Sequence, residues 1–284
     1  MNLRETLARR HRLLQRARVS RVDGRVRSLL YDEPRLYDLV FPDAGDRMGR
    51  MCRAAFARHL SAPPSSIVDI GCGTGRLLES LAATVGECWG VDYAESNVAY
   101  ARATRPRLTV RQGDMRTVRL GRRFDVVTCF GNALSYALTD ADLQATAGTF
   151  AAHAHAGSLL MVDVLNARSY LEGDGFRERI EGAVNTPEFS ATSVSTHSLD
   201  RSARLLRRTR VWFIPGRESV EDYAEYRLLY PAELRGLLEA ASFEVVGMYD
   251  NRDFRDTDLT GHAAAAGDVG GMGGRKLYAF ALKR

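Results

Sequence analysis

The chain has 284 residues, of which 45% are hydrophobic and 26% charged, and its formal net charge is +5 at pH 7. This composition is typical of a soluble globular protein. It contains no apolar run of about 18 residues, and its first residues lack the apolar core of a signal peptide. We therefore expect a cytoplasmic protein without a membrane partner.

All but two of the 40 basic residues are arginines, a bias typical of GC-rich bacterial coding sequences. The arginine cluster near the N-terminus contains no interleaved aromatic residues of the kind that stack on bases, so we expect no nucleic-acid partner. The cysteines show no metal-ligand spacing and are predicted to be reduced thiols: Cys52, Cys72, Cys88 and Cys129.

Apolar residues and arginines recur at near-helical spacing over residues 1–30, which predicts an amphipathic helix. Such a helix must cover an apolar groove or a partner subunit, so a homo-oligomer formed through it is expected. An aromatic segment over residues 31–42 and a helix over residues 48–60 follow. We interpret residues 1–62 as N-terminal helices and a lid.

An apolar strand over residues 66–70 runs into a glycine-rich turn and then into a helix over residues 77–83. Glycines let a ligand approach the main chain closely, and the free N–H groups of the helix face an anion. A dinucleotide-binding turn has the spacing G-x-G-x-x-G, whereas here the third glycine comes one residue early. This spacing favours a ligand with a carboxylate and a nucleoside over one with a pyrophosphate. The candidate binding residues are Asp69, Gly71, Cys72, Gly73, Thr74 and Gly75.

A second strand, over residues 87–91, ends at Asp92, about 20 residues after the first glycine of the turn. A doubly wound fold places a carboxylate there to bind ribose hydroxyls. Tyr93, the next residue, is a further candidate for cofactor contact. The alternative interpretation is that Asp92 caps the helix predicted over residues 94–104.

Three more strands are predicted over residues 108–114, 124–130 and 158–163, with a helix over residues 140–153 between the last two. Short apolar strands that alternate with helices predict a parallel, doubly wound sheet with right-handed crossovers. The carboxyl ends of its strands then meet at one rim.

The pattern D-x-G-x-G-x-G at residues 69–75 resembles the first motif of class I S-adenosylmethionine-dependent methyltransferases. The resemblance implies that Asp114 contacts the adenine amino group and that Met115 covers the adenine face. It also implies that the run after the fourth strand lies beside the methionine part of the cofactor. The residues of the run after the fourth strand are Phe130, Gly131 and Asn132. For Asp114 a turn or cap role is the alternative.

After the fifth strand the pattern becomes alternating and β-like, which predicts an acceptor-binding insert over residues 166–230. A helix over residues 231–240 and strands over residues 243–249 and 276–282 then match the methyltransferase ending, whose last strand is antiparallel. The cofactor-binding core is thus assigned to residues 63–165 and 231–284. The predicted fold is α/β: a doubly wound seven-stranded sheet with its last strand antiparallel, an N-terminal helical lid and an antiparallel β insert after strand five.

The glycine-rich tract over residues 268–274 lies on the link between the last two strands, at the cofactor rim. It is interpreted either as a gate or as a disordered segment, and both alternatives stay open.

Residues 124–139 look like the matching stretch of nucleotide-sugar N-methyltransferases and of glycine methyltransferase relatives from antibiotic pathways. This resemblance implies that Tyr136 faces the acceptor. Residues 31–42 resemble the aromatic lid that precedes the core in small-molecule methyltransferases, which implies that Tyr37 and Asp38 approach the bound sulfonium or substrate. A core or packing role is the alternative for both tyrosines. The segment 163–168 departs from the E-P-W-W-like run of the sugar enzymes, which argues against a sugar-nucleotide acceptor.

We therefore expect S-adenosylmethionine-dependent methyl transfer to an amine or hydroxyl of a small molecule in secondary metabolism. Transfer or cyclisation of the aminocarboxypropyl group, and a non-catalytic S-adenosylmethionine-binding protein, are the alternatives. No histidine pair has metal-ligand spacing, so no metal is expected. His197 and Arg208 lie in the insert, where a charged residue could bind an acidic substrate or simply occupy an exposed strand face.

Overall fold

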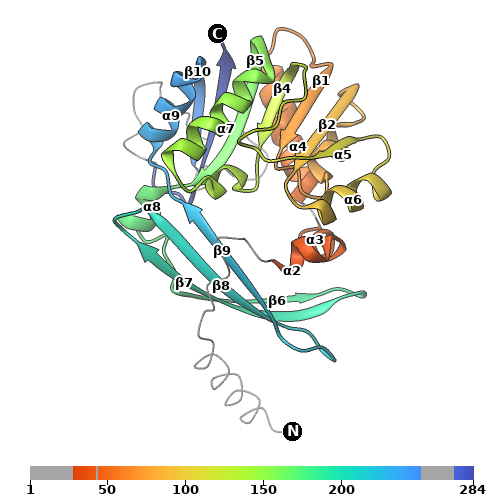
Figure 1. Ribbon diagram of the computed structural model, residues 1–284, viewed down its shortest axis with the longest axis vertical. Helices are drawn as coiled ribbons and strands as arrows, with labels where there is room; N and C mark the ends of the chain where they lie inside the picture. Colours follow the sequence, from red (N-terminus) through yellow and green to blue (C-terminus); the bar gives the residue numbers. More distant parts are fainter. Residues whose placement is uncertain (1–27, 43, 251–271) are drawn as a thin grey trace.

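The computed structural model describes residues 28–42, 44–250 and 272–284. The helix predicted near the N-terminus, the oligomer contact assigned to it and most of the glycine-rich tract therefore lie outside the described residues. Within them, two sheets are joined by helices and by a short N-terminal lid (Figure 1).

The larger sheet has seven strands in the order β10-β11-β5-β4-β1-β2-β3. All neighbouring pairs are parallel except those of β11, which runs antiparallel to both β10 and β5. The predicted doubly wound sheet with an antiparallel last strand is confirmed. The strands are β1 (Ser66–Ile70), β2 (Glu87–Asp92), β3 (Thr109–Gln112), β4 (Phe124–Cys129), β5 (Ala154–Leu165), β10 (Phe243–Asp250) and β11 (Lys276–Lys283).

Helices cover both faces of this sheet, which explains why its central strands are almost continuously apolar. All five residues of β1 are buried. One core cluster joins the sheet to α7 and α9, and a second joins its other face to α4, α5 and α6. The helices are α4 (Ala44–His59), α5 (Arg76–Leu81), α6 (Glu95–Thr104), α7 (Asp140–Ala152) and α9 (Pro231–Ala240).

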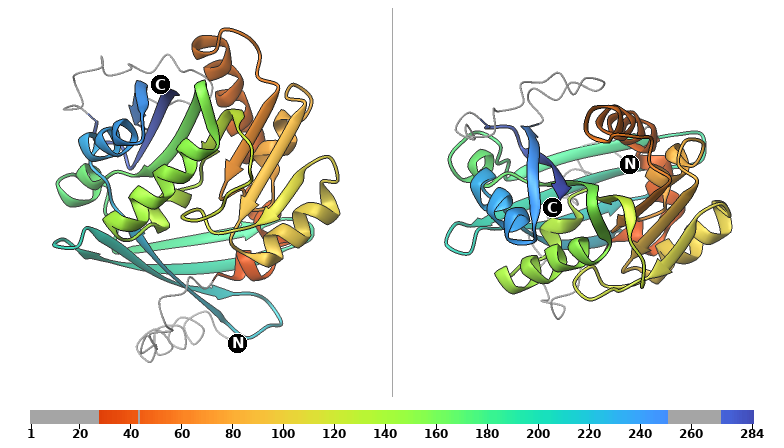
Figure 2. Two further views of the ribbon diagram at one scale, coloured as in Figure 1. Left: turned by 45° about the horizontal axis from the view of Figure 1, so that its top comes forward. Right: turned by 90° about the horizontal axis from the view of Figure 1, so that it is seen from above.

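A second sheet of four antiparallel strands lies across the carboxyl end of the large sheet (Figures 1 and 2). It follows β5 and the short helix α8 (Ala167–Leu171), so an antiparallel sheet occupies the place where the β insert was predicted. Its strands, in spatial and chain order, are β6 (Arg179–Asn185), β7 (Ser190–Asp200), β8 (Leu205–Phe213) and β9 (Val220–Arg227).

Two short helices, α2 (Leu29–Asp32) and α3 (Pro34–Val40), lie between the two sheets (Figure 1). Pro34 stands at the start of α3, where a missing N–H costs nothing. Apolar side chains of both helices pack against Trp212 and Ile214 of the second sheet. The predicted helical lid is therefore seated on the second sheet, beside the rim of the first.

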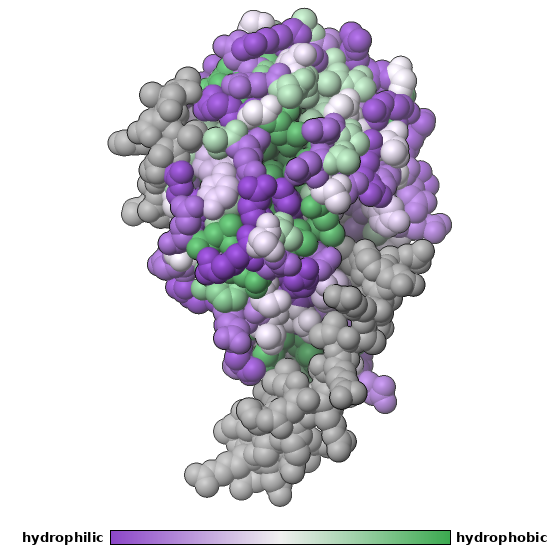
Figure 3. Space-filling model, turned by 60° about the vertical axis from the view of Figure 1, so that its left-hand side comes forward, coloured by the Kyte–Doolittle hydropathy of each residue, from purple (hydrophilic) through white to green (hydrophobic). Residues whose placement is uncertain are grey.

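Most of the face drawn in Figure 3 is hydrophilic, with hydrophobic residues visible in patches between polar ones. None of the helices in the described part of the chain is long and apolar enough to cross a membrane.

Candidate functional site

The glycine-rich turn between β1 and α5 has a left-handed backbone at its three glycines, and two of these show why glycine is required. A Cβ on Gly71, at φ 85°, would lie 2.6 Å from the Cβ of Ala133. A Cβ on Gly73, at φ 55°, would meet nothing within 4 Å. The turn thus packs tightly at its first glycine and leaves the backbone open at its second, as a ligand that approaches the main chain requires.

Asp92 lies at the carboxyl end of β2, directly beside the turn. One carboxylate oxygen accepts from the N–H of Gly73 at 2.7 Å. The other accepts from the N–H of Ala94 at 2.9 Å and from Asn97 Nδ2 at 3.1 Å. Ala94, not Asp92, is the N-cap residue of α6, and no side chain caps this helix, so the alternative helix-capping interpretation of Asp92 is wrong. Burial raises the pKa of this carboxyl group. The oxygen facing Gly73 accepts one bond from the described residues and retains a lone pair for a hydroxyl donor.

Asp69, the acid of the motif, lies beneath the turn and is only 3% exposed. Thr128 of β4 donates to it at 2.7 Å. Burial raises the pKa of Asp69 to about 7, although the bond from Thr128 acts in the opposite direction. Cys72 of the turn is likewise buried. These two residues support the turn from below.

Asp114 and Met115 follow β3 at the same rim. The guanidinium of Arg116 holds the Asp114 carboxylate at 2.6 Å and lowers its pKa, while the N–H of Arg116 donates at 2.9 Å. The turn role considered for Asp114 is therefore present in the structure. Met115 packs against the core, and Tyr93, after β2, is 72% exposed.

The run after β4 continues the rim. Asn132 has a left-handed backbone at φ 64°, and its N–H donates to Asp163 at 2.7 Å. Lys276 Nζ donates to the other oxygen of Asp163 at 2.7 Å. The side-chain oxygen of Asn132 is buried without a hydrogen-bond partner among the described residues. Phe130 is buried, whereas Gly131 is exposed. This orphaned acceptor fits a ligand with an N–H donor, such as the ammonium of an amino acid.

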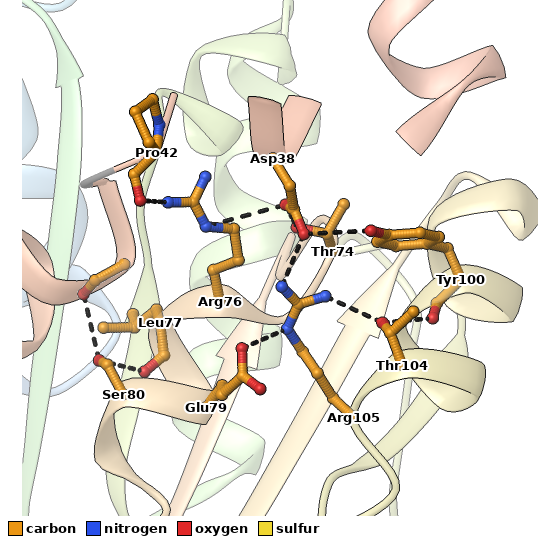
Figure 4. A network of polar contacts seen from close by, with 11 residues as sticks. Asp38, Pro42, Thr74, Arg76, Leu77, Glu79, Ser80, Tyr100, Thr104 and Arg105 are labelled. Carbon is orange, nitrogen blue, oxygen red and sulfur yellow. Dashed lines mark hydrogen bonds and ion pairs between the residues drawn. The ribbon is translucent and has the colours of Figure 1, made fainter. Parts of the chain in front are cut away.

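The lid is fastened to the glycine-rich turn through Asp38 of α3 (Figure 4). Its carboxylate accepts from Thr74 Oγ1 at 2.7 Å and pairs with Arg105 at 2.6 Å. Arg76 at the start of α5 lies 3.8 Å away and also donates to the carbonyl of Pro42. Asp38 thus binds the turn and the lid to each other.

Replacing Asp38 with alanine is expected to destabilise the protein by about 1–3 kcal/mol, because the 9% exposed Arg105 loses a charged partner. Glu79, the other partner of Arg105, has a 56% exposed side chain, and its replacement by alanine should cost less than about 1 kcal/mol. Urea denaturation of both variants measures this difference. Equal losses would contradict the assignment of Asp38 as the principal anchor of the lid.

The two predicted acceptor-site tyrosines occupy different surroundings. Tyr136 lies in a row of hydroxyl groups, 3.0 Å from that of Tyr31 in α2 and 3.3 Å from that of Tyr226 in β9. Burial raises the pKa of Tyr136 well above its usual range, so the phenol is neutral at physiological pH. Tyr37 is half-buried and packs against Phe41 in a tilted arrangement, with 5.0 Å between the ring centres. Burial also raises the pKa of Tyr37.

Several residues at this junction were not singled out from the sequence. Arg105 and Tyr226 carry no local motif, so no signal marked them, whereas Tyr31 begins the aromatic segment over residues 31–42. Two other residues had a signal in the sequence. Asp163 ends the predicted fifth strand, and Lys276 is one of only two lysines in the chain. The structure brings the lid, the rim and the second sheet together around these side chains.

Residues 67–157 match the model of a family described as a methyltransferase domain. A curated relative is the dTDP-3-amino-3,6-dideoxy-alpha-D-glucopyranose N,N-dimethyltransferase of Streptomyces fradiae. It is 35% identical over 130 residues, which cover 45% of this chain and 51% of the relative. The chain spans about half the length of the curated relatives that it matches.

Two solved structures are similar to this chain over most of their length. Streptomyces venezuelae DesVI has a TM-score of 0.69 at 24% identity, covering 89% of this chain and 99% of that one. An S-adenosylmethionine-bound amino pentose methyltransferase from Micromonospora echinaspora, involved in calicheamicin biosynthesis, has a TM-score of 0.65 at 22% identity. The match covers 91% of this chain and 99% of that chain.

The chain therefore has the fold of class I S-adenosylmethionine-dependent methyltransferases, and residues 67–157 match a methyltransferase domain. Over somewhat less than half of its length the chain is similar in sequence to dTDP-amino-sugar N,N-dimethyltransferases of Streptomyces. The identification made from the glycine-rich turn and the order of the strands is confirmed.

Proposed function

We propose that this protein binds S-adenosylmethionine at the rim of the large sheet and transfers its methyl group to an amine of a small molecule in secondary metabolism. The observation that carries the proposal is the pairing of the glycine-rich turn, open at Gly73, with the carboxylate of Asp92. The methyltransferase domain and the sugar N,N-dimethyltransferase relatives support it.

The residues along the rim suit the parts of this cofactor. Asp92 would accept from the ribose hydroxyls, and Asp114 and Met115 would meet the adenine. The buried side-chain oxygen of Asn132 would accept from the ammonium of the methionine part. When bound, the cofactor supplies a sulfonium methyl group that is already activated for attack. The protein then has mainly to orient the acceptor and to exclude water, which can supply roughly 7–11 kcal/mol.

Tyr136 and Tyr37 would act on the acceptor as neutral hydroxyls, because burial raises the pKa of both. A neutral phenol can accept a hydrogen bond from an amine N–H and so direct the nitrogen lone pair toward the methyl group. The phenol itself takes no proton in this role, and the amine must bind as its neutral free base, because an ammonium has no lone pair. This role favours an amine acceptor, which is nucleophilic when neutral, over an alcohol, which must lose a proton.

Replacing Tyr136 with phenylalanine should leave S-adenosylhomocysteine affinity unchanged and lower kcat by about 10-fold or more, since one oriented hydrogen bond to the acceptor is lost. Tyr230→Phe is the matched control, because that hydroxyl donates to Glu172 in a solvent-exposed hydrogen bond. Loss of cofactor affinity together with turnover in Tyr136→Phe would instead assign Tyr136 a structural role.

The reaction is tested by incubating the protein with S-adenosylmethionine and a panel of amino sugars, both free and linked to a nucleoside diphosphate. Mass spectrometry should find S-adenosylhomocysteine and an acceptor that has gained one or two methyl groups. Methylthioadenosine as the co-product would overturn methyl transfer in favour of aminocarboxypropyl transfer. Cofactor binding without turnover over the whole panel would point to a non-catalytic protein.

A further inference from the structure

One face of the second sheet carries basic side chains in register. His197 of β7 lies opposite Arg208 of β8, and Ser195 lies opposite Arg210. Partners that lie opposite each other in an antiparallel pair project on the same side of the sheet, as do residues two apart in one strand. His197, Arg208 and Arg210 therefore share one face, which we call the arginine face.

The arginine face lies beside the predicted acceptor site. The guanidinium carbon of Arg208 lies 5.6 Å from the centre of the Tyr226 ring. That ring packs against the ring of Tyr136 in a tilted arrangement, with 5.0 Å between the ring centres. Arg208 and Tyr136 thus both contact the ring of Tyr226.

Successive arginines of β8 differ sharply in their partners. Arg207, which projects to the opposite face, pairs with Glu225 at 2.6 Å and with Asp200 at 3.4 Å. Arg208 forms no ion pair with any described acidic residue, and its Nε is buried without a hydrogen-bond partner among them. Arg210 donates to a neutral acceptor, Ser195 Oγ, at 3.0 Å.

One buried carboxylate among the described residues of this face, that of Asp222, attracts both arginines but can balance only one of their two positive charges. Asp222 of β9 lies opposite Arg210, but its two oxygens accept from the N–H of Leu29 at 2.6 Å and from Trp212 Nε1 at 2.8 Å. Asp222 therefore fastens the lid to the second sheet.

The positive charges of this face affect the pKa of the neighbouring His197. Burial, together with the charges of Arg208, Arg275 and Arg210, lowers the pKa of His197 to about 4. Its Nδ1 is also buried without a partner among the described residues. Unpaired cations next to a buried, neutral imidazole are costly unless an anion joins them.

We propose that Arg208 and Arg210 bind an anionic group of the methyl acceptor, a phosphate or a carboxylate, and thereby present its amine at Tyr136. The inference rests on the proposed function, since it assigns the second sheet to the same acceptor. A guanidinium binds either anion through two parallel hydrogen bonds, and the buried Nε of Arg208 provides one of those donors. The acceptor class is accordingly an amine that also carries an anionic group.

Calorimetric titration at constant ionic strength tests this site with three probes: inorganic pyrophosphate, inorganic phosphate and succinate. At least one probe should bind the wild-type protein, and the preference between phosphates and succinate identifies the kind of anion. Arg208→Gln should weaken that binding by about 10–100-fold. Arg208→Lys keeps the positive charge but lacks the paired N–H donors of a guanidinium. Its affinity for the probe should lie between those of the wild type and Arg208→Gln.

Arg207→Gln is the control, because it removes a neighbouring arginine from the opposite face and should leave probe binding unchanged. Binding of none of the probes, or equal losses in Arg207→Gln and Arg208→Gln, would overturn the inference. The same samples are titrated with S-adenosylhomocysteine. Retained S-adenosylhomocysteine binding without anion binding refutes only the anion site, whereas lost S-adenosylhomocysteine binding in the wild type refutes the proposed function.

Discussion

Asparagine in place of Asp69 is expected to make the protein more stable than the wild type at about pH 8, by on the order of 4 kcal/mol. Burial raises the pKa of Asp69 from 3.8 to about 7. The folded state therefore favours the protonated acid, and the associated stability is fully present below the unfolded pKa. It is lost as the pH rises from about 4 through 7. Asparagine can still accept from Thr128 and never ionises.

The measurement is urea denaturation of both proteins at several pH values between about 4 and 8. The stability difference between variant and wild type should grow with pH. Asp125→Asn provides a control of opposite sign, because bonds from Ser65 and His155 outweigh partial burial and lower the pKa of Asp125 to about 2. That variant should be less stable than the wild type at neutral pH, with the difference fading as the pH falls through about 4 toward 2. A pH-independent difference for Asp69→Asn would show that Asp69 is ionised throughout.

Asp92→Ala is expected to weaken S-adenosylhomocysteine binding by about 10–100-fold, because charge-assisted hydrogen bonds to the ribose are worth about 1.5–3 kcal/mol. Glu95→Ala, which removes an exposed acid from the first turn of α6, should leave the affinity unchanged. Isothermal titration calorimetry measures all three proteins.

Because Asp92 also accepts from the N–H of Gly73, its loss could act through the turn instead of through the ribose. Adenosine and an analogue without ribose hydroxyls separate these effects. The wild type should prefer adenosine, and Asp92→Ala should lose that preference. If the variant still discriminates between the two ligands, Asp92 does not contact the ribose.

Local patterns predicted most of the large sheet because each strand is a short apolar run that a turn residue ends. Helix α9 was predicted over its full length, since Pro231 fixes its first turn. Strand β5 begins at Ala154, earlier than the predicted residue 158. The segment from Ala154 to Gly157 lacks the β-branched residues that mark a strand. Its extension depends on pairing with Phe124 of β4 across a register shift, which no local pattern reveals.

The rim acids could be placed from the sequence because each one follows a strand of a parallel sheet. The contacts around the site could not be predicted from the sequence, because they join residues far apart in the chain. Asp38 meets Arg105 across 67 positions, and the hydroxyls of Tyr31 and Tyr136 meet across 105. Asp163 and Lys276 are 113 positions apart, and only the insertion of β11 beside β5 brings them together. Such pairs depend on tertiary packing and have no signature in any window of residues.

Calorimetric titration of the full chain with S-adenosylmethionine and S-adenosylhomocysteine tests the central claim most directly. We predict saturable binding of both ligands at one site per chain, with S-adenosylhomocysteine competing for the S-adenosylmethionine site. Absence of binding by both ligands would contradict the account and would mean that the glycine-rich turn and Asp92 serve a different ligand.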